Sequence, residues 1–250
     1  MAKIVAVVNQ KGGVGKTTSA VNLAAALSEQ GARVLLCDFD PQANATSGLG
    51  VEKKSLKRSV YDAIVQGVPV EQCIVSTKFA DVLPSTAALA GAGVELIGFD
   101  NREHCLKRTL EAVKAKYDYI FIDSPPSLEL LTLNALCAAD SILIPVQCEY
   151  YALEGLSDLM ATLRAVKRRL NPKLEIFGVL LTMFDGRTNF SSQVAEEVRR
   201  HFPGKVFVSV IPRNVRLAEA PSHGIPVTVY DRSSRGAKAY LSLAEEILRK

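Results

Sequence analysis

The amino-acid sequence predicts an α/β fold: a doubly wound, mostly parallel β-sheet flanked by helices on both faces. Apolar segments typical of strands alternate along the chain with segments that have helical periodicity. The strand segments are continuous runs of Val, Ile and Leu, as expected for strands that are buried on both faces. No repeat, low-complexity tract or Pro/Ser-rich linker divides the 250 residues, so we expect a single domain, 1–250.

The elements follow one another from the start of the chain. The first helical segment repeats apolar residues at Ala20, Leu23, Ala24 and Leu27 and ends at Gly31. We expect strands at residues 3–8, 33–38, 119–123, 141–146, 176–182 and 206–211. We expect helices at residues 16–30, 103–114, 128–138, 153–170, 193–202 and 237–248. Residues 48–56 and 74–93 are less regular and are expected to form surface loops with one or two short elements. In such a sheet a ligand binds at the carboxyl ends of the strands.

Composition excludes several classes of protein. With 48% apolar and 22% charged residues, the chain is globular rather than disordered. No apolar run approaches the roughly 18 residues that a membrane-spanning helix needs, and the opening apolar run turns polar at Asn9, so we expect no secretory leader. The five cysteines are scattered without a Cys-x-x-Cys pair, which favours buried, reduced thiols in a cytoplasmic protein over a zinc site.

A glycine-rich loop between the first strand and the first helix is the strongest functional signal. It reads Asn9-Gln10-Lys11-Gly12-Gly13-Val14-Gly15-Lys16-Thr17-Thr18. Three glycines in four positions let backbone N–H groups curl around a phosphate, and the following helix N-terminus adds partial positive charge. In this arrangement Lys16 reaches the β- and γ-phosphates and the Thr17 hydroxyl binds Mg²⁺. The loop therefore predicts a nucleotide triphosphate site.

The loop departs from the strict Walker A pattern. That pattern places a glycine where this chain has Gln10, and this chain carries a second lysine, Lys11, at the front of the loop. Residues 11–18 resemble the deviant Walker A motif of the ParA/MinD family of P-loop ATPases. The resemblance implies that Lys11, Gly12, Gly13, Val14, Gly15, Lys16, Thr17 and Thr18 bind ATP. It also implies a dimer interface at Lys11 and Gly12, where Lys11 reaches the nucleotide of the other subunit and acts with Lys16 in hydrolysis.

Acidic residues follow two of the predicted strands. Asp38 and Asp40 come at the end of the second strand, in a segment similar to switch I of the same family. The resemblance implies that Asp40 positions the attacking water and that Asp38 supports Mg²⁺. Asp123 ends the strand at residues 119–123, as in a Walker B motif, and is expected to hold Mg²⁺ through a water.

The resemblance extends over essentially the whole chain and is greatest to the small chromosomal ParA proteins of the Soj type. The segments that carry it are Ser124-Pro125-Pro126 and residues 182–185, 211–224 and 230–237. It implies that Pro212 and Asn214 contact the adenine ring and that Arg187 and Arg216 bind DNA.

The expected function is an ATP-dependent DNA-partitioning ATPase of a bacterial chromosome or plasmid, with ATP and Mg²⁺ as cofactors. The resemblance implies that an ATP-bound homodimer binds double-stranded DNA without sequence preference, so the protein is cytoplasmic and nucleoid-associated. A ParB-like partner then stimulates slow hydrolysis and release. Because the loop begins at residue 11, we expect no DNA-reading segment before it. Residues 151–250 hold 16 Lys and Arg against 10 Asp and Glu, which agrees with a polyanion partner.

Three alternatives remain open. A MinD-like membrane-associated ATPase needs an exposed amphipathic tail, whereas the C-terminal helix carries Glu245 and Glu246, so we expect no membrane partner. An iron–sulfur carrier needs cluster thiolates, and Cys105 and Cys137 lack a matching context. A DNA-coating protein without hydrolysis would have no need of Asp40, which this chain retains.

Overall fold

One seven-stranded sheet organises the chain in this computed structural model, which describes residues 1–127, 129–149 and 152–249. The strand order is β3-β4-β2-β5-β1-β6-β7, and only the β3–β4 pair is antiparallel. The strands are β1 (Lys3–Val7), β2 (Val34–Asp38), β3 (Val75–Ser76), β4 (Asp81–Leu83), β5 (Tyr119–Asp123), β6 (Ser141–Gln147) and β7 (Glu175–Thr182). The predicted fold class, a mostly parallel doubly wound sheet, is confirmed.

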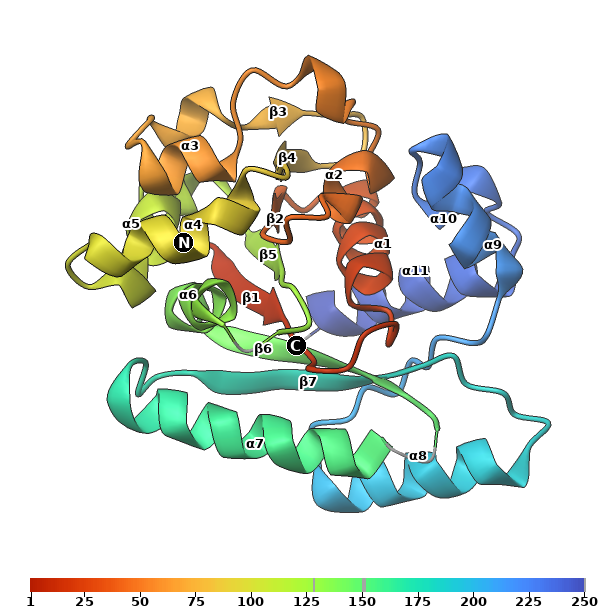
Figure 1. Ribbon diagram of the computed structural model, residues 1–250. Coiled ribbons are helices and arrows are strands. Elements are labelled where there is room, and N and C mark those ends of the chain that lie inside the picture. The colour runs from red at the N-terminus through yellow and green to blue at the C-terminus, as the bar shows by residue number, and fades with distance from the viewer. Residues whose placement is uncertain (128, 150–151, 250) are drawn as a thin grey trace.

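Helices cover both faces of this sheet (Figure 1). They are α1 (Lys16–Glu29), α2 (Asn44–Gly48), α3 (Val60–Val65), α4 (Leu89–Glu95), α5 (Cys105–Glu111), α6 (Leu130–Ala138), α7 (Ala152–Arg169), α8 (Asn189–His201), α9 (Val215–Glu219), α10 (Val227–Tyr230) and α11 (Arg235–Leu248). None of the helices in the described part of the chain is long and apolar enough to span a bilayer.

Two hydrophobic cores lie on opposite faces of the sheet. Along β1, Ile4 and Ala6 belong to the core beneath α5, α6 and α7, whereas Val5 and Val7 belong to the core beneath α1 and α11. Because successive residues of a strand point to opposite faces, both sets must be apolar. This explains the continuous apolar runs in the sequence. All five cysteines are buried and unpaired, as predicted.

The strand predicted at residues 206–211 is absent. This segment runs beside β7, where Phe207 N–H donates to the Val179 carbonyl, but only isolated bridges form. The N–H groups of Val208 and Ser209 instead donate to the Glu246 carboxylate of α11, each at 2.9 Å. A segment whose donors turn toward a helix cannot continue a ladder, so the prediction was wrong here.

Helix boundaries also differ from expectation. The helix predicted at 103–114 consists of α5 between two short 3₁₀ turns. Helix α8 begins at Asn189 rather than 193 because the Thr188 hydroxyl caps it by accepting from Ser191 N–H. The helix predicted at 128–138 begins at Leu130, and residue 128 lies outside the described residues.

Candidate nucleotide-binding site

The glycine-rich loop connects β1 to α1 at the carboxyl edge of the sheet (Figure 1). Gly13 and Gly15 have φ of 75° and 88°, in the left-handed region that favours glycine. A Cβ atom added at Gly12 or Gly13 would meet nothing within 4 Å, so the loop presents bare backbone to an open side. The Val14 carbonyl accepts from the Thr182 hydroxyl at 2.9 Å, which fixes the loop to the end of β7. An open glycine-rich backbone before a helix N-terminus is of the kind that binds phosphate.

Lys16 is the buried cation of the loop. Its side chain is only 7% exposed, and Nζ donates to the Lys11 carbonyl at 3.0 Å. Burial lowers the pKa of Lys16, and the charges of Asp123 and Asp40 oppose that change. The structure therefore brings three predicted site residues together around one ammonium group. A phosphate beside it would supply the negative charge that the buried lysine lacks.

Asp123 is a buried carboxylate that makes no hydrogen bond of good geometry, although the Thr17 hydroxyl lies near it. Neither of its oxygens has a hydrogen-bond partner among the described residues. Burial raises the pKa of Asp123 well above its ordinary value and the charge of Asp38 raises it further, while the nearby Thr17 hydroxyl and Lys16 charge oppose the rise. A desolvated carboxylate beside a hydroxyl is an oxygen-donor set that fits Mg²⁺. Within the described residues no three His, Cys, Asp or Glu side chains form a metal site by themselves, as in Mg²⁺ sites completed by phosphate.

Asp38 has a different environment. Its Oδ2 accepts from the N–H and the hydroxyl of Thr46, both at 2.7 Å, and its Oδ1 accepts from Asp40 N–H at 3.2 Å. Burial raises the pKa of Asp38 to about 6, and the Thr46 bonds limit that rise. These bonds hold the Asp40 loop and the start of α2 against β2. The predicted role of Asp38 at Mg²⁺ stays a prediction, and the visible role of its carboxylate is to position this loop.

Asp40 lies in the turn after β2. Its Oδ1 accepts from Gln42 N–H at 2.9 Å, and its carboxylate is close enough to Lys16 to influence that residue's pKa. Ala43, which directly follows Gln42, has φ of 53°, an uncommon conformation for a residue with a side chain. The turn therefore presents Asp40 at the loop edge, where the sequence predicts a catalytic carboxylate.

A pocket of about 370 Å³ adjoins the loop on the α1 side. Pro212 and Asn214, the residues expected to contact adenine, line it together with Gly15, Thr18 and Met183. Asn214 also caps α9, because its side-chain oxygen accepts from Arg216 N–H at 2.9 Å. Met183 has φ of 50° and lies at the end of β7. The structure thus places a largely apolar, ring-sized pocket where the first turn of α1 can connect it to the phosphate loop.

The remaining predicted residues lie at the surface. Lys11 packs beside Gly155 of α7, with its Cδ 3.9 Å from the position of an added Cβ. Arg187 donates from Nε and Nη2 to the Asp185 carboxylate at 2.9 and 2.7 Å. Arg216 pairs with Glu219 at 2.8 Å and with Asp231 at 3.3 Å. Both arginines predicted to bind DNA are therefore held by carboxylates of their own chain.

Comparisons with known proteins identify the family. A family model described as an AAA domain matches residues 2–176. The chain is 60% identical over 249 residues, 99% of its own length and 98% of the relative's, to the sporulation initiation inhibitor protein Soj of Bacillus subtilis (strain 168). It is 52% identical to the chromosome partitioning protein ParA of Myxococcus xanthus (strain DK1622), covering 100% of this chain and 89% of that protein. The chain belongs to the Soj/ParA family of chromosome-partitioning ATPases.

A solved structure with the same fold relates this Soj/ParA chain to a nucleotide complex. Cobyrinic acid a,c-diamide synthase from Mycobacterium smegmatis, with bound ADP and magnesium, superimposes with a TM-score of 0.87 at 38% identity. The alignment covers 100% of this chain and 95% of that one. The P-loop ATPase fold predicted from the glycine-rich loop is confirmed by the family match and by the likeness to the cell division ATPase MinD of Pyrococcus furiosus, with a TM-score of 0.82 at 31% identity over 100% of this chain and 99% of that one.

Two site residues escaped the sequence analysis. Thr46 holds Asp38, and its hydroxyl in turn accepts from Ser85 N–H at 2.9 Å. Thr182 holds the phosphate loop at Val14. Each is an ordinary threonine in the sequence, and its role arises from contacts 8 to 168 residues away along the chain. No local pattern signals such contacts.

Proposed function

We propose that this Soj/ParA chain, residues 1–250 acting as one ATPase domain, binds ATP with Mg²⁺ and dimerises through the bound nucleotide. The dimer binds double-stranded DNA without sequence preference on the bacterial nucleoid. A ParB-like partner then stimulates hydrolysis and release. The observation that carries the proposal is the orphaned Asp123 carboxylate beside Thr17 and the buried Lys16, because these groups complement a magnesium-bound triphosphate.

The phosphate loop supplies binding and orientation. Backbone N–H groups of residues 12–17 and the Lys16 ammonium bind the phosphate oxygens, and the pocket at Pro212 and Asn214 holds the base. Thr17 and Asp123 would hold Mg²⁺, which would supply positive charge to the bound triphosphate. Lys16, the Val14 carbonyl and the Asn214 side chain already make hydrogen bonds within the chain, which limits the entropy lost on binding.

Hydrolysis needs an oriented water and positive charge near the transferred phosphoryl group. Asp40, at the edge of the loop that Asp38 and Thr46 hold, orients the attacking water and receives its proton. Lys16 stabilises charge on the phosphoryl oxygens from within the chain, and Lys11 does so from the other subunit. Turnover is slow in the single chain because the second lysine is absent until two chains meet.

DNA binding follows from the dimer. Two chains double the number of Arg187 and Arg216 side chains on one assembly, and phosphate contacts of this kind carry no sequence information. The carboxylates that hold these arginines compete with DNA phosphates for them. A single chain therefore binds DNA weakly, whereas the ATP-bound pair binds it firmly.

DNA co-sedimentation with ATP, with ADP and without nucleotide, at two salt concentrations, tests this function. We expect sedimentation only with ATP and a steep loss at the higher salt, since counterion release governs such binding. Light scattering on the protein without DNA should show twice the monomer mass with ATP, and the monomer mass with ADP or without nucleotide. The variant Lys16→Ala should neither sediment with DNA nor double in mass. Equal mass with and without ATP would refute the proposal, and sedimentation with anionic liposomes instead of DNA would favour the membrane-associated alternative.

A further inference from the structure

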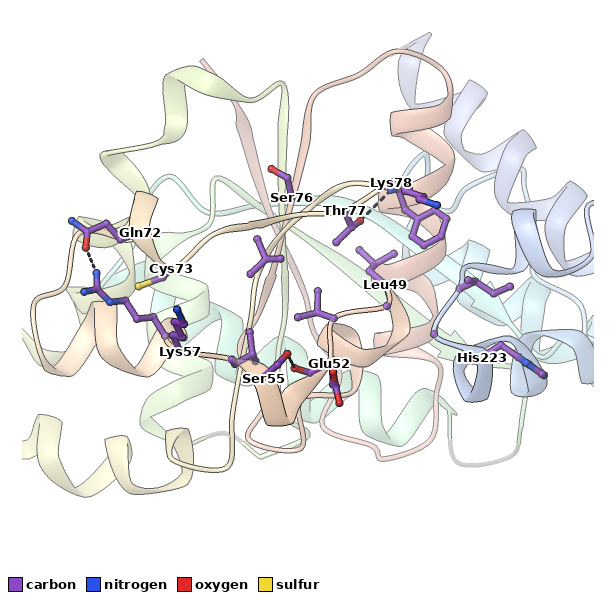
Figure 2. Close-up of a pocket in the computed structure, with 18 residues that line it drawn as sticks. Leu49, Glu52, Ser55, Lys57, Gln72, Cys73, Ser76, Thr77, Lys78 and His223 are labelled. Atoms are coloured by element: carbon purple, nitrogen blue, oxygen red, sulfur yellow. Dashed lines mark hydrogen bonds between the residues drawn. The ribbon is translucent and has the colours of Figure 1, made fainter.

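A large groove elsewhere on the chain shares no lining residue with the nucleotide site. Its volume is about 1020 Å³, the upper end of the roughly 300–1,000 Å³ that small-molecule sites occupy. Figure 2 shows that three distant parts of the chain form it: the segment after α2 with Leu49 and Glu52, the β3 segment with Ser76, and the turn at His223. We call this the β3 groove.

The floor of the β3 groove is apolar. Leu49, Val51, Leu56, Val75 and Phe79 line it. Leu49 is buried, whereas Leu56, Val75 and Phe79 are only partly covered by the rest of the chain. Partly covered apolar side chains in a concavity gain free energy when a ligand covers them. The floor therefore suits a ligand with apolar side chains.

The rim of the β3 groove is strongly basic. Lys57, Arg58 and Lys78 line it, and Glu52 is the only acidic residue among the lining residues. Lys53 and Lys54 lie in the adjoining 3₁₀ turn, and all five cations are exposed. Within the described residues none of the five forms an ion pair with a carboxylate, in contrast to Arg187 and Arg216. This unneutralised charge attracts an acidic ligand.

One side of the groove is a sheet edge. The strand β3 pairs only with β4, antiparallel, and is the last strand in the sheet order. An edge strand offers unpaired backbone groups to an extended chain, which can add itself as a further strand. The lysines that surround β3 discourage pairing with another copy of this chain, because both copies would bring the same charge.

The walls of the groove are already in place. Gly50 and Gly224, with φ of 79° and 65°, approach so closely that a Cβ on Gly50 would lie 3.0 Å from the Gly224 carbonyl oxygen. Arg58 donates to the Gln72 side chain across another part of the rim. At its start, α2 is held by the bond from Thr46 to Asp38. A preformed groove needs little ordering when a ligand binds.

We propose that the β3 groove binds an extended, acidic segment of a partner protein that also carries apolar side chains. Apolar side chains of the segment cover the floor, its carboxylates pair with the rim, and its backbone adds to β3. A DNA duplex fits this site poorly, because a convex duplex contacts protruding cations and gains nothing from an apolar floor. The site is independent of ATP and of the proposed function.

The test uses a fluorescein-labelled ten-residue peptide of alternating Glu and Val, with a matched peptide of alternating Lys and Val. We expect the fluorescence anisotropy of the acidic peptide, but not that of the lysine peptide, to rise when the full-length protein is added. The affinity for the acidic peptide should fall as the salt concentration increases. The double variant Lys57→Glu with Lys78→Glu should weaken binding roughly ten-fold or more. The matched control, Lys107→Glu with Lys173→Glu, reverses two exposed lysines outside the groove and should bind as the parent does.

Three results would overturn the proposal. These are no binding of the acidic peptide, equal binding of the lysine peptide, or equal weakening in the control variant. The groove variant should also keep its thermal unfolding midpoint and its DNA sedimentation. If it loses DNA sedimentation while peptide binding stays unchanged, the groove is a DNA surface and the peptide assignment is wrong.

Discussion

Asp38 and Asp123 are paired in the register of β2 and β5 but have opposite hydrogen-bond environments. The Asp38 carboxylate accepts from Thr46 and from Asp40 N–H, whereas that of Asp123 has no hydrogen-bond partner among the described residues. Burial and the charge of Asp38 both disfavour the ionised form of Asp123, and a cation bound between the two carboxylates would offset this cost. The buried carboxylate of Asp123 should therefore lower the unfolding free energy of the nucleotide-free protein.

The variant Asp123→Asn should stabilise the nucleotide-free protein. It removes a carboxylate whose charged form burial and the charge of Asp38 disfavour, and we expect a gain of about 1–2 kcal/mol in unfolding free energy. Because burial raises the folded-state pKa of Asp123, this carboxyl holds its proton more tightly when folded. Its penalty is absent below the ordinary carboxyl pKa, grows as pH rises toward the folded-state pKa, and is complete above it. Urea unfolding of both proteins between pH 4 and pH 8 measures the widening difference.

The same variant separates stability from function. Asp123→Asn should lose most of the additional stabilisation that Mg²⁺ gives in the presence of ATP, since asparagine offers the ion no charge. The control is Asp118→Asn. This variant alters an exposed carboxylate that pairs with Arg33 and lies just before β5, the strand that ends at Asp123. A variant Asp123→Asn that is less stable than the parent at pH 8 would contradict this account of the site.

The variant Gly12→Val tests the dimer without disturbing the single chain. A Cβ at Gly12 meets nothing within 4 Å, and its φ is not in the left-handed region, so the valine fits the monomer. We therefore expect nucleotide binding close to that of the parent but no ATP-dependent increase in mass by light scattering. Gly15→Val is the contrast, because φ of 88° strains any side chain there and ATP binding itself should fall. Normal dimerisation of Gly12→Val would place the interface elsewhere.

The sequence predicted the fold class and the elements that carry the phosphate loop, but it did not predict every element around them. The phosphate loop and the ends of β2 and β5 are local patterns, in which glycines or an acid follow an apolar run, and such patterns survive into the structure. Residues 206–211 have an equally apolar pattern, but the N–H groups of Val208 and Ser209 donate to Glu246 of α11, and Phe207 packs over Gly178 of β7. A Cβ at Gly178 would lie 2.2 Å from the Phe207 ring. That contact lies beyond any sequence window.

Short helices and strands, and the ion-pair partners of two arginines, were not predicted for a related reason. Helices α2, α9 and α10 have four or five residues, too few to show a period. Strands β3 and β4 have two and three residues, yet they form the edge of the β3 groove. The ion pairs of Arg187 and Arg216 also depend on turns that bring carboxylates to them. Their exposure could be predicted from the sequence, but their partners could not.

The variant Asp185→Asn should strengthen DNA binding in the ATP state. The Arg187 guanidinium holds the pKa of the Asp185 carboxyl well below its ordinary value, so this carboxylate is charged at neutral pH and competes with phosphate. Removing its charge should raise DNA affinity several-fold and steepen the salt dependence. Arg187→Ala should lower DNA affinity. In a dimer it should also reduce the slope of log affinity against log salt concentration by about two. If neither variant changes DNA sedimentation, Arg187 does not contact DNA.

Asp40→Ala and Asp40→Asn together distinguish catalysis from folding of the loop. The Asp40 side-chain oxygen accepts from Gln42 N–H, and asparagine keeps that acceptor whereas alanine removes it. Neither variant can take a proton from water, so we expect both to lose hydrolysis by roughly 10²-fold or more. Both should still form the ATP-dependent dimer and sediment with DNA, now without release over time. Hydrolysis that survives in Asp40→Asn but not in Asp40→Ala would mean that this residue shapes the turn and that another group orients the water.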